Sequence, residues 1–168
     1  MAFDPNLLPL AGFAALMVAA AVTDFVRLVI PNTVVAGLAL LWLLHIETMR
    51  GTTPAATLET LACAAAVLIV GLLLFARGLI GGGDVKLLSV ATLWAGAGAL
   101  PSLLALTGLV GGVLALLFMT PLRSRLTAPR LDGAPDASAG FAGGGTPIPY
   151  GVAIAAAALV VTIPPYFG

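Results

Sequence analysis

The amino-acid sequence predicts an all-α, polytopic membrane protein with six transmembrane helices, and three observations support this prediction. Apolar residues make up 61% of the 168 positions, whereas Lys and Arg together number seven and Asp and Glu together number seven. The apolar residues gather in stretches of about 20 residues, which is the length of helix that crosses a hydrocarbon layer. These stretches lack the alternating pattern of a membrane β-barrel. A small soluble domain could not bury so much apolar surface, because too much of its surface faces water.

Six apolar stretches are long enough to be spanning helices, which satisfy their own backbone groups inside lipid. They are predicted at Leu7–Thr23, Ile30–Met49, Thr57–Ala76, Val85–Leu100, Ser102–Leu122 and Tyr150–Phe167. The first stretch has no basic residue before it, so we interpret it as a span and not as a secretory signal peptide. The second follows a chain break at Pro31 and Asn32, because proline and asparagine favour turns.

The turns around the remaining stretches and their small residues support the prediction that these stretches are spanning helices. The third is an uninterrupted apolar run, and the fourth is short, with Gly-rich turns at both ends. Gly108, Gly111 and Gly112 in the fifth and the run Ala153–Ala158 in the sixth predict close helix contacts. Residues 123–149 are rich in Gly, Pro, Ala, Ser and Asp, which predicts a flexible loop within a single membrane-embedded domain, 1–168.

Charge and cysteine usage exclude several functional classes. The net charge is zero, so the basic excess that nucleic-acid binding requires is missing and no nucleic-acid partner is expected. One cysteine excludes an internal disulfide and a cysteine-based zinc site, and we expect neither a metal nor a cofactor. Cys63 and the single histidine, His45, are predicted to be packing residues.

The basic residues predict the orientation of the chain. Six of the seven fall in the first, third and fifth loops between the six predicted spans, and only Arg50 falls in an even loop. The positive-inside rule therefore predicts cytosolic odd loops, with both termini outside.

This topology brings two aspartates to the cytosolic edge. Asp24 ends the first predicted span, and Asp84 opens the fourth after three consecutive glycines, 81–83. Ionisable residues at the membrane are unfavourable unless they are paired or wetted, which makes them functional candidates. A second interpretation stays open, in which each carboxylate only marks a helix end and pairs with Arg27 or Lys86.

Two carboxylates that meet can carry out acid and base chemistry on a water molecule, with a peptide bond as the natural target. One ionised aspartate would take a proton from water while the other, kept protonated, polarises the carbonyl group. The helix macrodipole would favour a protonated Asp24 at a helix C-terminus and an ionised Asp84 at a helix N-terminus.

The sequence around these aspartates resembles the type IV prepilin peptidases, intramembrane aspartyl proteases of the GxGD class. The resemblance rests on three stretches, namely Asp24, Arg27, Ile30, Pro31 and Asn32; then Gly81, Gly83, Asp84, Val85, Lys86 and Leu87; and then Pro147–Ile154. It implies an aspartic endopeptidase that removes the leader of type IV prepilins at the cytosolic face of a bacterial or archaeal cytoplasmic membrane. The implied partners are the prepilin, with its leader and N-terminal apolar helix, and the lipid bilayer.

The same resemblance assigns roles to individual residues. Asp24 and Asp84 are the implied catalytic pair, with no metal. The implied substrate-binding or site-shaping residues are Gly81, Gly83, Lys86, Arg27, Pro31, Asn32, Pro149, Tyr150 and Gly151.

One departure from the larger members of this family narrows the prediction. Those members carry a cytosolic domain with paired Cys-x-x-Cys zinc motifs and also methylate the new N-terminus. This chain has one cysteine and a short first loop, so it resembles the peptidase-only branch that serves tight-adherence (Flp-type) pili. Related short enzymes process archaeal preflagellins, and the sequence separates the two poorly. Two alternatives remain, a small proton-coupled transporter, which is expected to bind at the midplane of inverted repeats, and a non-enzymatic membrane subunit of a secretion apparatus.

Overall fold

The computed structural model describes residues 7–48, 53–119 and 148–163, and the regular structure in these ranges is helical throughout. The elements are α1 (Leu7–Arg27), α2 (Asn32–Thr48), α3 (Pro54–Ala76), α4 (Gly82–Ala95), the 3₁₀ turn η1 (Ala97–Ala99), α5 (Leu100–Met119) and α7 (Tyr150–Thr162). The prediction of an all-α fold is therefore confirmed for the described residues.

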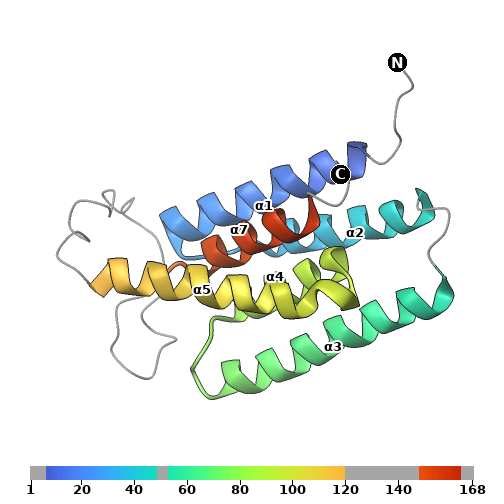
Figure 1. Cartoon of the computed structure of the whole chain (residues 1–168). Helices are drawn as coiled ribbons and strands as arrows, with labels where there is room; N and C mark the ends of the chain where they lie inside the picture. The colour runs from blue at the N-terminus through green and yellow to red at the C-terminus, as the bar shows by residue number, and fades with distance from the viewer. Residues whose placement is uncertain (1–6, 49–52, 120–147, 164–168) are drawn as a thin grey trace.

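The helices form a bundle in which successive elements run in opposite directions. Figure 1 shows that α1, α3 and α5 end at the same end of the bundle, where α2, α4 and α7 begin. α7 packs against α1, α4 and α5, whereas α3 packs mainly against α4. The alternation brings the segments around Asp24 and Asp84 to one end, as the sequence predicts.

The centre of the bundle depends on the small side chains of α7. Four of its alanines, Ala153, Ala155, Ala157 and Ala158, are buried against neighbouring helices. On α5, a Cβ atom at Gly111 would lie 2.9 Å from Cε1 of Tyr150, so α5 and α7 are too close there for any residue larger than glycine to fit without a shift. Gly108 and Gly112 have open space beside them, so the predicted close contact is confirmed at Gly111 and not at the other two glycines.

Aromatic packing closes the core at the other end of the bundle. Trp94 stacks on Phe13 and on His45, with ring centroids 4.5 Å and 5.2 Å apart. Its indole Nε1–H donates a hydrogen bond of 3.0 Å to the backbone oxygen of Leu38. His45 is buried, which agrees with its predicted packing role.

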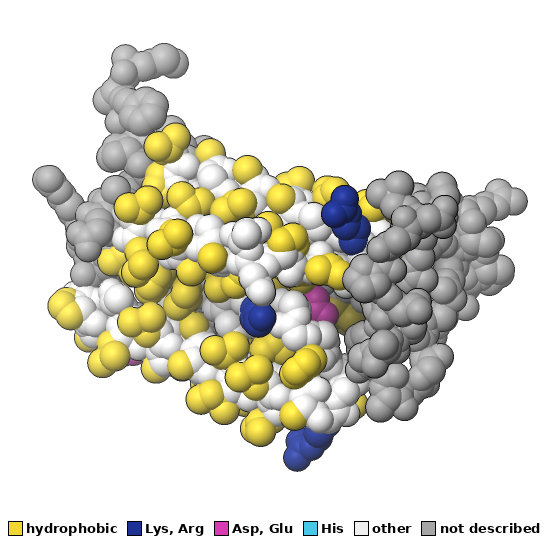
Figure 2. All heavy atoms as spheres, turned by 180° about the vertical axis from the view of Figure 1, so that it is seen from behind, with side chains coloured by type: hydrophobic (Ala, Val, Ile, Leu, Met, Phe, Trp, Pro, Cys, Tyr) yellow, Lys and Arg dark blue, Asp and Glu magenta, His cyan; other side chains and the backbone are white. Residues whose placement is uncertain are grey.

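The described helices are long and apolar enough, in part, to suit a membrane. Three helical segments are long and apolar enough to cross a bilayer, Leu8–Arg27, Pro54–Ala76 and Ala97–Phe118, while Asn32–Ile46 and Tyr150–Thr162 are shorter apolar helices. Large apolar side chains such as Leu58 and Leu116 are exposed. Figure 2 shows one face on which apolar side chains prevail and few charged groups interrupt them.

The six-span prediction is confirmed only in part. α4 has 14 residues, which at about 1.5 Å per residue is roughly 21 Å, shorter than a hydrocarbon core of about 30 Å. Its C-terminus comes early because Gly96 adopts a φ of 79° and leads into η1. The predicted flexible loop at 123–149 lies outside the described residues except for its last two positions.

The end of α1 differs from the prediction in a way that matters for the site. The helix continues one turn past Thr23, to Arg27, and Leu28 then reverses the chain with a φ of 53°. The N–H of Leu28 donates to the backbone oxygen of Asp24 over 2.8 Å. Asp24 therefore lies inside the last turn of α1. The helix continues this far because the Asp24 carboxyl group is buried and the next two residues, Phe25 and Val26, are apolar.

Candidate functional site

Asp24 is enclosed where the last turn of α1 meets the start of α7. Its side chain is 5% exposed. The backbone N–H groups of Gly151 and Val152, in the first turn of α7, face the carboxyl group. Among the described residues its buried Oδ2 has no hydrogen-bond partner, so this oxygen keeps an unused acceptor.

Glycine at position 151 allows α7 to begin so close to Asp24. A Cβ atom at this position would lie 2.8 Å from Oδ2 and 2.9 Å from Cγ of Asp24. Pro149, which is buried, precedes the helix at the N-cap position, where an N–H group is not needed. The Pro149–Gly151 segment thus places helix N–H groups beside a buried carboxyl group.

Ile30 locks this arrangement to the start of α4. Its side chain lies beside two glycines, because a Cβ atom at Gly83 would be 3.3 Å from Cβ of Ile30 and one at Gly151 would be 2.9 Å from its Cδ1. Ile30 belongs to the sequence motif, but it was not predicted as a site residue from the sequence. Its apolar side chain gave no chemical signal, and only the packing shows its place between α4 and α7.

Asp84 is the third residue of α4 and faces back over the start of its own helix. The backbone N–H of Gly81, the N-cap residue, interacts with the Asp84 carboxyl group. This contact resembles the return contact of a capping box, in which an acidic side chain at the third position satisfies the N-cap amide. A Cβ atom at Gly81 would lie 2.9 Å from Oδ2 of Asp84, so the small residue there admits the contact.

The two carboxyl groups, from helices 60 positions apart in sequence, lie close enough to interact electrostatically. Asp84 also caps its helix, so the second interpretation, in which the carboxylate marks a helix end, holds in part for this residue. A helix cap alone does not require a second, buried carboxyl group nearby.

The predicted pairing of each aspartate with a neighbouring base is not found among the described residues. Nζ of Lys86 donates a 3.0 Å hydrogen bond to Oδ1 of Asn32, which ties α4 to α2. Asp84 and Lys86 are two positions apart on a helix, a spacing at which side chains do not face each other. Arg27 is exposed while Asp24 is buried.

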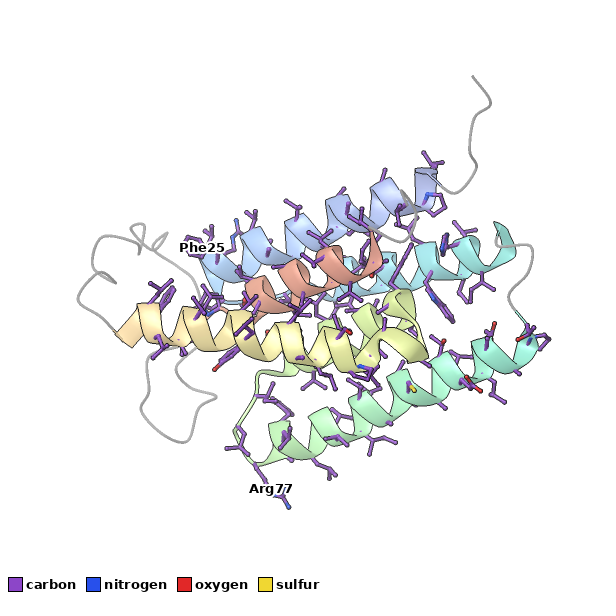
Figure 3. The ribbon with its side chains drawn as sticks, viewed as in Figure 1. Phe25 and Arg77 are labelled. Carbon is purple, nitrogen blue, oxygen red and sulfur yellow. The ribbon has the colours of Figure 1, made fainter. Side chains whose placement is uncertain are left out.

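Further basic and apolar side chains mark the surface at this end of the bundle. Figure 3 shows Phe25 at the end of α1 and Arg77 just after α3, both with side chains that point away from the bundle. With Arg27 and Lys86, Arg77 makes this end the basic end of the described chain, as the loop prediction requires.

An apolar groove opens directly beside Asp84. It has a volume of about 630 Å³ and is lined by residues of α3, α4, α5 and α7, with Gly81, Asp84 and Tyr150 among them. Asp24 does not line it. Sequence reasoning missed this groove, because an unfilled space between helices leaves no periodicity signal.

The predicted assignment of protonation from helix dipoles considered only one of the two helix ends that meet Asp24. It placed Asp24 only at the C-terminus of α1, where the macrodipole opposes negative charge. The structure also places the N-terminus of α7 against the same carboxyl group, and that dipole acts in the opposite sense. Dipoles therefore do not distinguish the acid from the base.

The predicted site residues gather at this end of the bundle, although they do different things. Gly81 and Gly151 contact the aspartates, Gly83 contacts Ile30, and Asn32 binds Lys86. Pro31 accepts backbone hydrogen bonds at the start of α2, and its carbonyl oxygen is 3.1 Å from the N–H group of Val34. Within the described residues, no three His, Cys, Asp or Glu side chains are grouped to hold a metal ion.

Comparison with known proteins assigns a family to this arrangement. Residues 11–116 match the type IV leader peptidase family. The matched range includes both aspartates and Gly81–Lys86 and ends before Pro149. No curated protein and no solved structure matches the chain.

Proposed function

The chain belongs to the type IV leader peptidase family, and we propose that it is an aspartic endopeptidase that removes the leader of Flp-type prepilins at the cytosolic membrane face. The observation that carries the proposal is the meeting of Asp24 and Asp84, from α1 and α4, at one end of the bundle. Both are buried or half-buried in an apolar protein, where an uncompensated pair of carboxylates is unfavourable. Such a pair is suited to sharing one proton.

The pair can hydrolyse a peptide bond with a single water molecule. The ionised aspartate takes a proton from the water, whose oxygen adds to the carbonyl carbon, while the protonated aspartate gives its proton to the carbonyl oxygen. The resulting gem-diol then collapses: the C–N bond breaks as the leaving amine takes a proton from the aspartate that accepted one, and one hydroxyl of the diol returns a proton to the other aspartate, so the pair again shares a single proton. The proton count belongs to the coupled pair and not to either residue.

The cytosolic location and the Flp-type assignment rest on where the basic residues lie and on the length of the link between α1 and α2. The exposed bases Arg27, Arg77 and Lys86 lie at the same end as the aspartates, which supports a cytosolic site through the positive-inside rule. The link between α1 and α2 comprises only residues 28–31, which leaves no room there for a zinc-binding domain. This short link supports the peptidase-only, Flp-type assignment.

The transporter alternative is disfavoured by the same geometry. Transporter sites lie near the bilayer midplane, often at broken helices. Asp24 is in the last turn of α1 and Asp84 in the first turn of α4, so both lie at helix ends.

The test is leader removal by variants in which one carboxyl group becomes an amide. Asp24→Asn and Asp84→Asn should each abolish cleavage of a co-expressed Flp-type prepilin, because an amide can neither accept the proton of water nor reload as an acid. Insertion should persist, since an uncharged isostere is easier to place in a membrane than an aspartate.

Glu59→Gln is the matched control. It neutralises an exposed acid on α3 away from the groove and should leave cleavage unchanged. Near wild-type processing by either Asn variant, at equal membrane levels, would show that the two aspartates are not the catalytic pair.

A further inference from the structure

The groove beside Asp84 is elongated along the helix axes. Its α3 wall includes Cys63, Val67, Val70, Gly71 and Leu74, which recur at helical spacing on one face. From Cys63 to Leu74 this wall is eleven residues, or about 16 Å at roughly 1.5 Å per residue.

The opposite wall comes from α5, and α4 forms the floor. Leu100, Leu104, Thr107 and Gly108 of α5 line the groove, again at helical spacing. α3 packs on α4 and η1, whereas α5 packs mainly on α7, so the two walls are held apart by the floor. The walls keep apolar side chains uncovered, with Val70 56% and Leu104 43% exposed.

Two features show that the groove is suited to a polypeptide. Asp84 and Gly81 form one end of it, so whatever fills the groove continues into the proposed catalytic site. Its α5 wall also holds the Thr107 hydroxyl, whose oxygen is buried and has no hydrogen-bond partner among the described residues. A lipid chain offers no acceptor to this hydroxyl, whereas a carbonyl oxygen of a peptide helix keeps a second lone pair that can accept a hydrogen bond from it.

We infer that the groove between α3 and α5 holds the apolar helix that follows the scissile bond of the substrate, with Cys63 beside the residue about eight positions beyond that bond. This inference rests on the proposed function. A basic leader stays in water at the cytosolic end, so the apolar side of the cleaved bond is the part that extends into the membrane.

The position of Cys63 follows from the packing of α3 on α4. A Cβ atom at Gly71 would lie 2.5 Å from Cγ1 of Val85, so these two residues are level with each other and one position from Asp84. Cys63 is eight positions before Gly71 on the same helix, which is about 12 Å along the groove at roughly 1.5 Å per residue. An α-helical occupant covers the same distance in eight residues.

The experiment uses Cys63 as a built-in probe, because it is the single cysteine of the chain. A prepilin with one cysteine at each position from five to eleven after its scissile bond is co-expressed with the Asp84→Asn protein, which retains the uncleaved substrate. A mild oxidant then forms disulfides wherever the Cα atoms come within about 7 Å. We expect the strongest cross-link near the eighth position and a weaker one a helical turn away.

The matched control moves the thiol to the outer side of α3. Ala62→Cys combined with Cys63→Ala places it at the same depth, on an exposed position that does not line the groove. It should cross-link at least tenfold less. Equal cross-linking from both thiols, or none from Cys63 at any substrate position while the wild-type protein cleaves each prepilin, would overturn the inference and leave the proposed function intact. Failure of the wild-type protein to cleave any prepilin would overturn both.

Thr107→Val gives a second, independent readout. Valine keeps the shape of threonine and removes a buried hydroxyl without a partner, so the folded protein should be no less stable. If the hydroxyl binds the substrate, KM should rise several-fold with little change in kcat. An unchanged KM would show that the groove wall does not contact the substrate at this depth.

Discussion

Gly151→Ala is the substitution through which the geometry of the site is most directly tested. The added methyl group would lie 2.8 Å from Oδ2 of Asp24 and 2.9 Å from Cδ1 of Ile30. Ordinary contacts of a Cβ atom begin near 3.4 Å, so a carboxyl group that relieves the overlap by its own movement shifts by about 0.6 Å, the difference between 3.4 and 2.8 Å.

The expected effect is on catalysis more than on folding. Alanine favours a helix over glycine by about 1 kcal/mol, which partly offsets an overpacking penalty of roughly 1–3 kcal/mol. A misplacement of about 1 Å can reduce a rate on the order of 100-fold, so a 0.6 Å shift corresponds to roughly a tenfold loss. We therefore expect kcat to fall about tenfold or more while the protein still accumulates in the membrane.

The assay is the initial rate of leader removal from a purified prepilin in proteoliposomes, at equal amounts of enzyme. Gly112→Ala is the control, because it also adds a methyl group to a helical glycine but has nothing within 4 Å. If Gly151→Ala and Gly112→Ala both process the prepilin at the wild-type rate, then α7 does not confine the Asp24 carboxyl group as argued.

Three further predictions concern the whole protein. A reporter active only in the periplasm should be silent when fused after Arg125 and active when fused at Gly168, and the reverse pattern would remove the cytosolic site. Leader removal should continue in the presence of a metal chelator, and the purified protein should transfer no methyl group to its product; loss of cleavage on chelation, or methyl transfer, would contradict the peptidase-only assignment. The rate should fall on the acid side as the base of the Asp24–Asp84 pair becomes protonated and on the alkaline side as the acid ionises, so a flat profile of kcat/KM against pH would contradict a shared proton.

The positions of the helices could be predicted from the sequence because apolar length is a local property. The predicted third segment, Thr57–Ala76, ends at the same residue as α3, where an apolar run meets Arg77. The end of α1 was predicted at Thr23 and lies at Arg27, because Asp24 was expected to mark the end of the span at the membrane edge. Only the packing of α7 shows that this carboxyl group is buried.

The composition of the site was predictable only where side chains carry chemistry or where a motif is distinctive. Asp24, Asp84 and the glycines of 81–83 have a signal in the sequence. Ile30, Thr107 and Cys63 do not, because their roles come from which helix lies opposite. The dipole argument was incomplete for the same reason, since it considered the helix that carries Asp24 and not the helix that begins against it.

The two aspartates differ in how accessible they are from the groove, and this difference determines which of them a bound peptide reaches first. Asp84 lines the groove and is half-buried, whereas Asp24 is 5% exposed and does not line it. A peptide that fills the groove therefore meets Asp84 first, and Asp24 acts from the side that α7 covers. The side chain of Ile30 packs closely against Gly83 of α4 and Gly151 of α7. A larger or smaller side chain at any of these three positions should therefore move Asp24 relative to Asp84. We expect such changes to lower kcat more than they raise KM, since the groove that binds the substrate is formed mainly by α3 and α5.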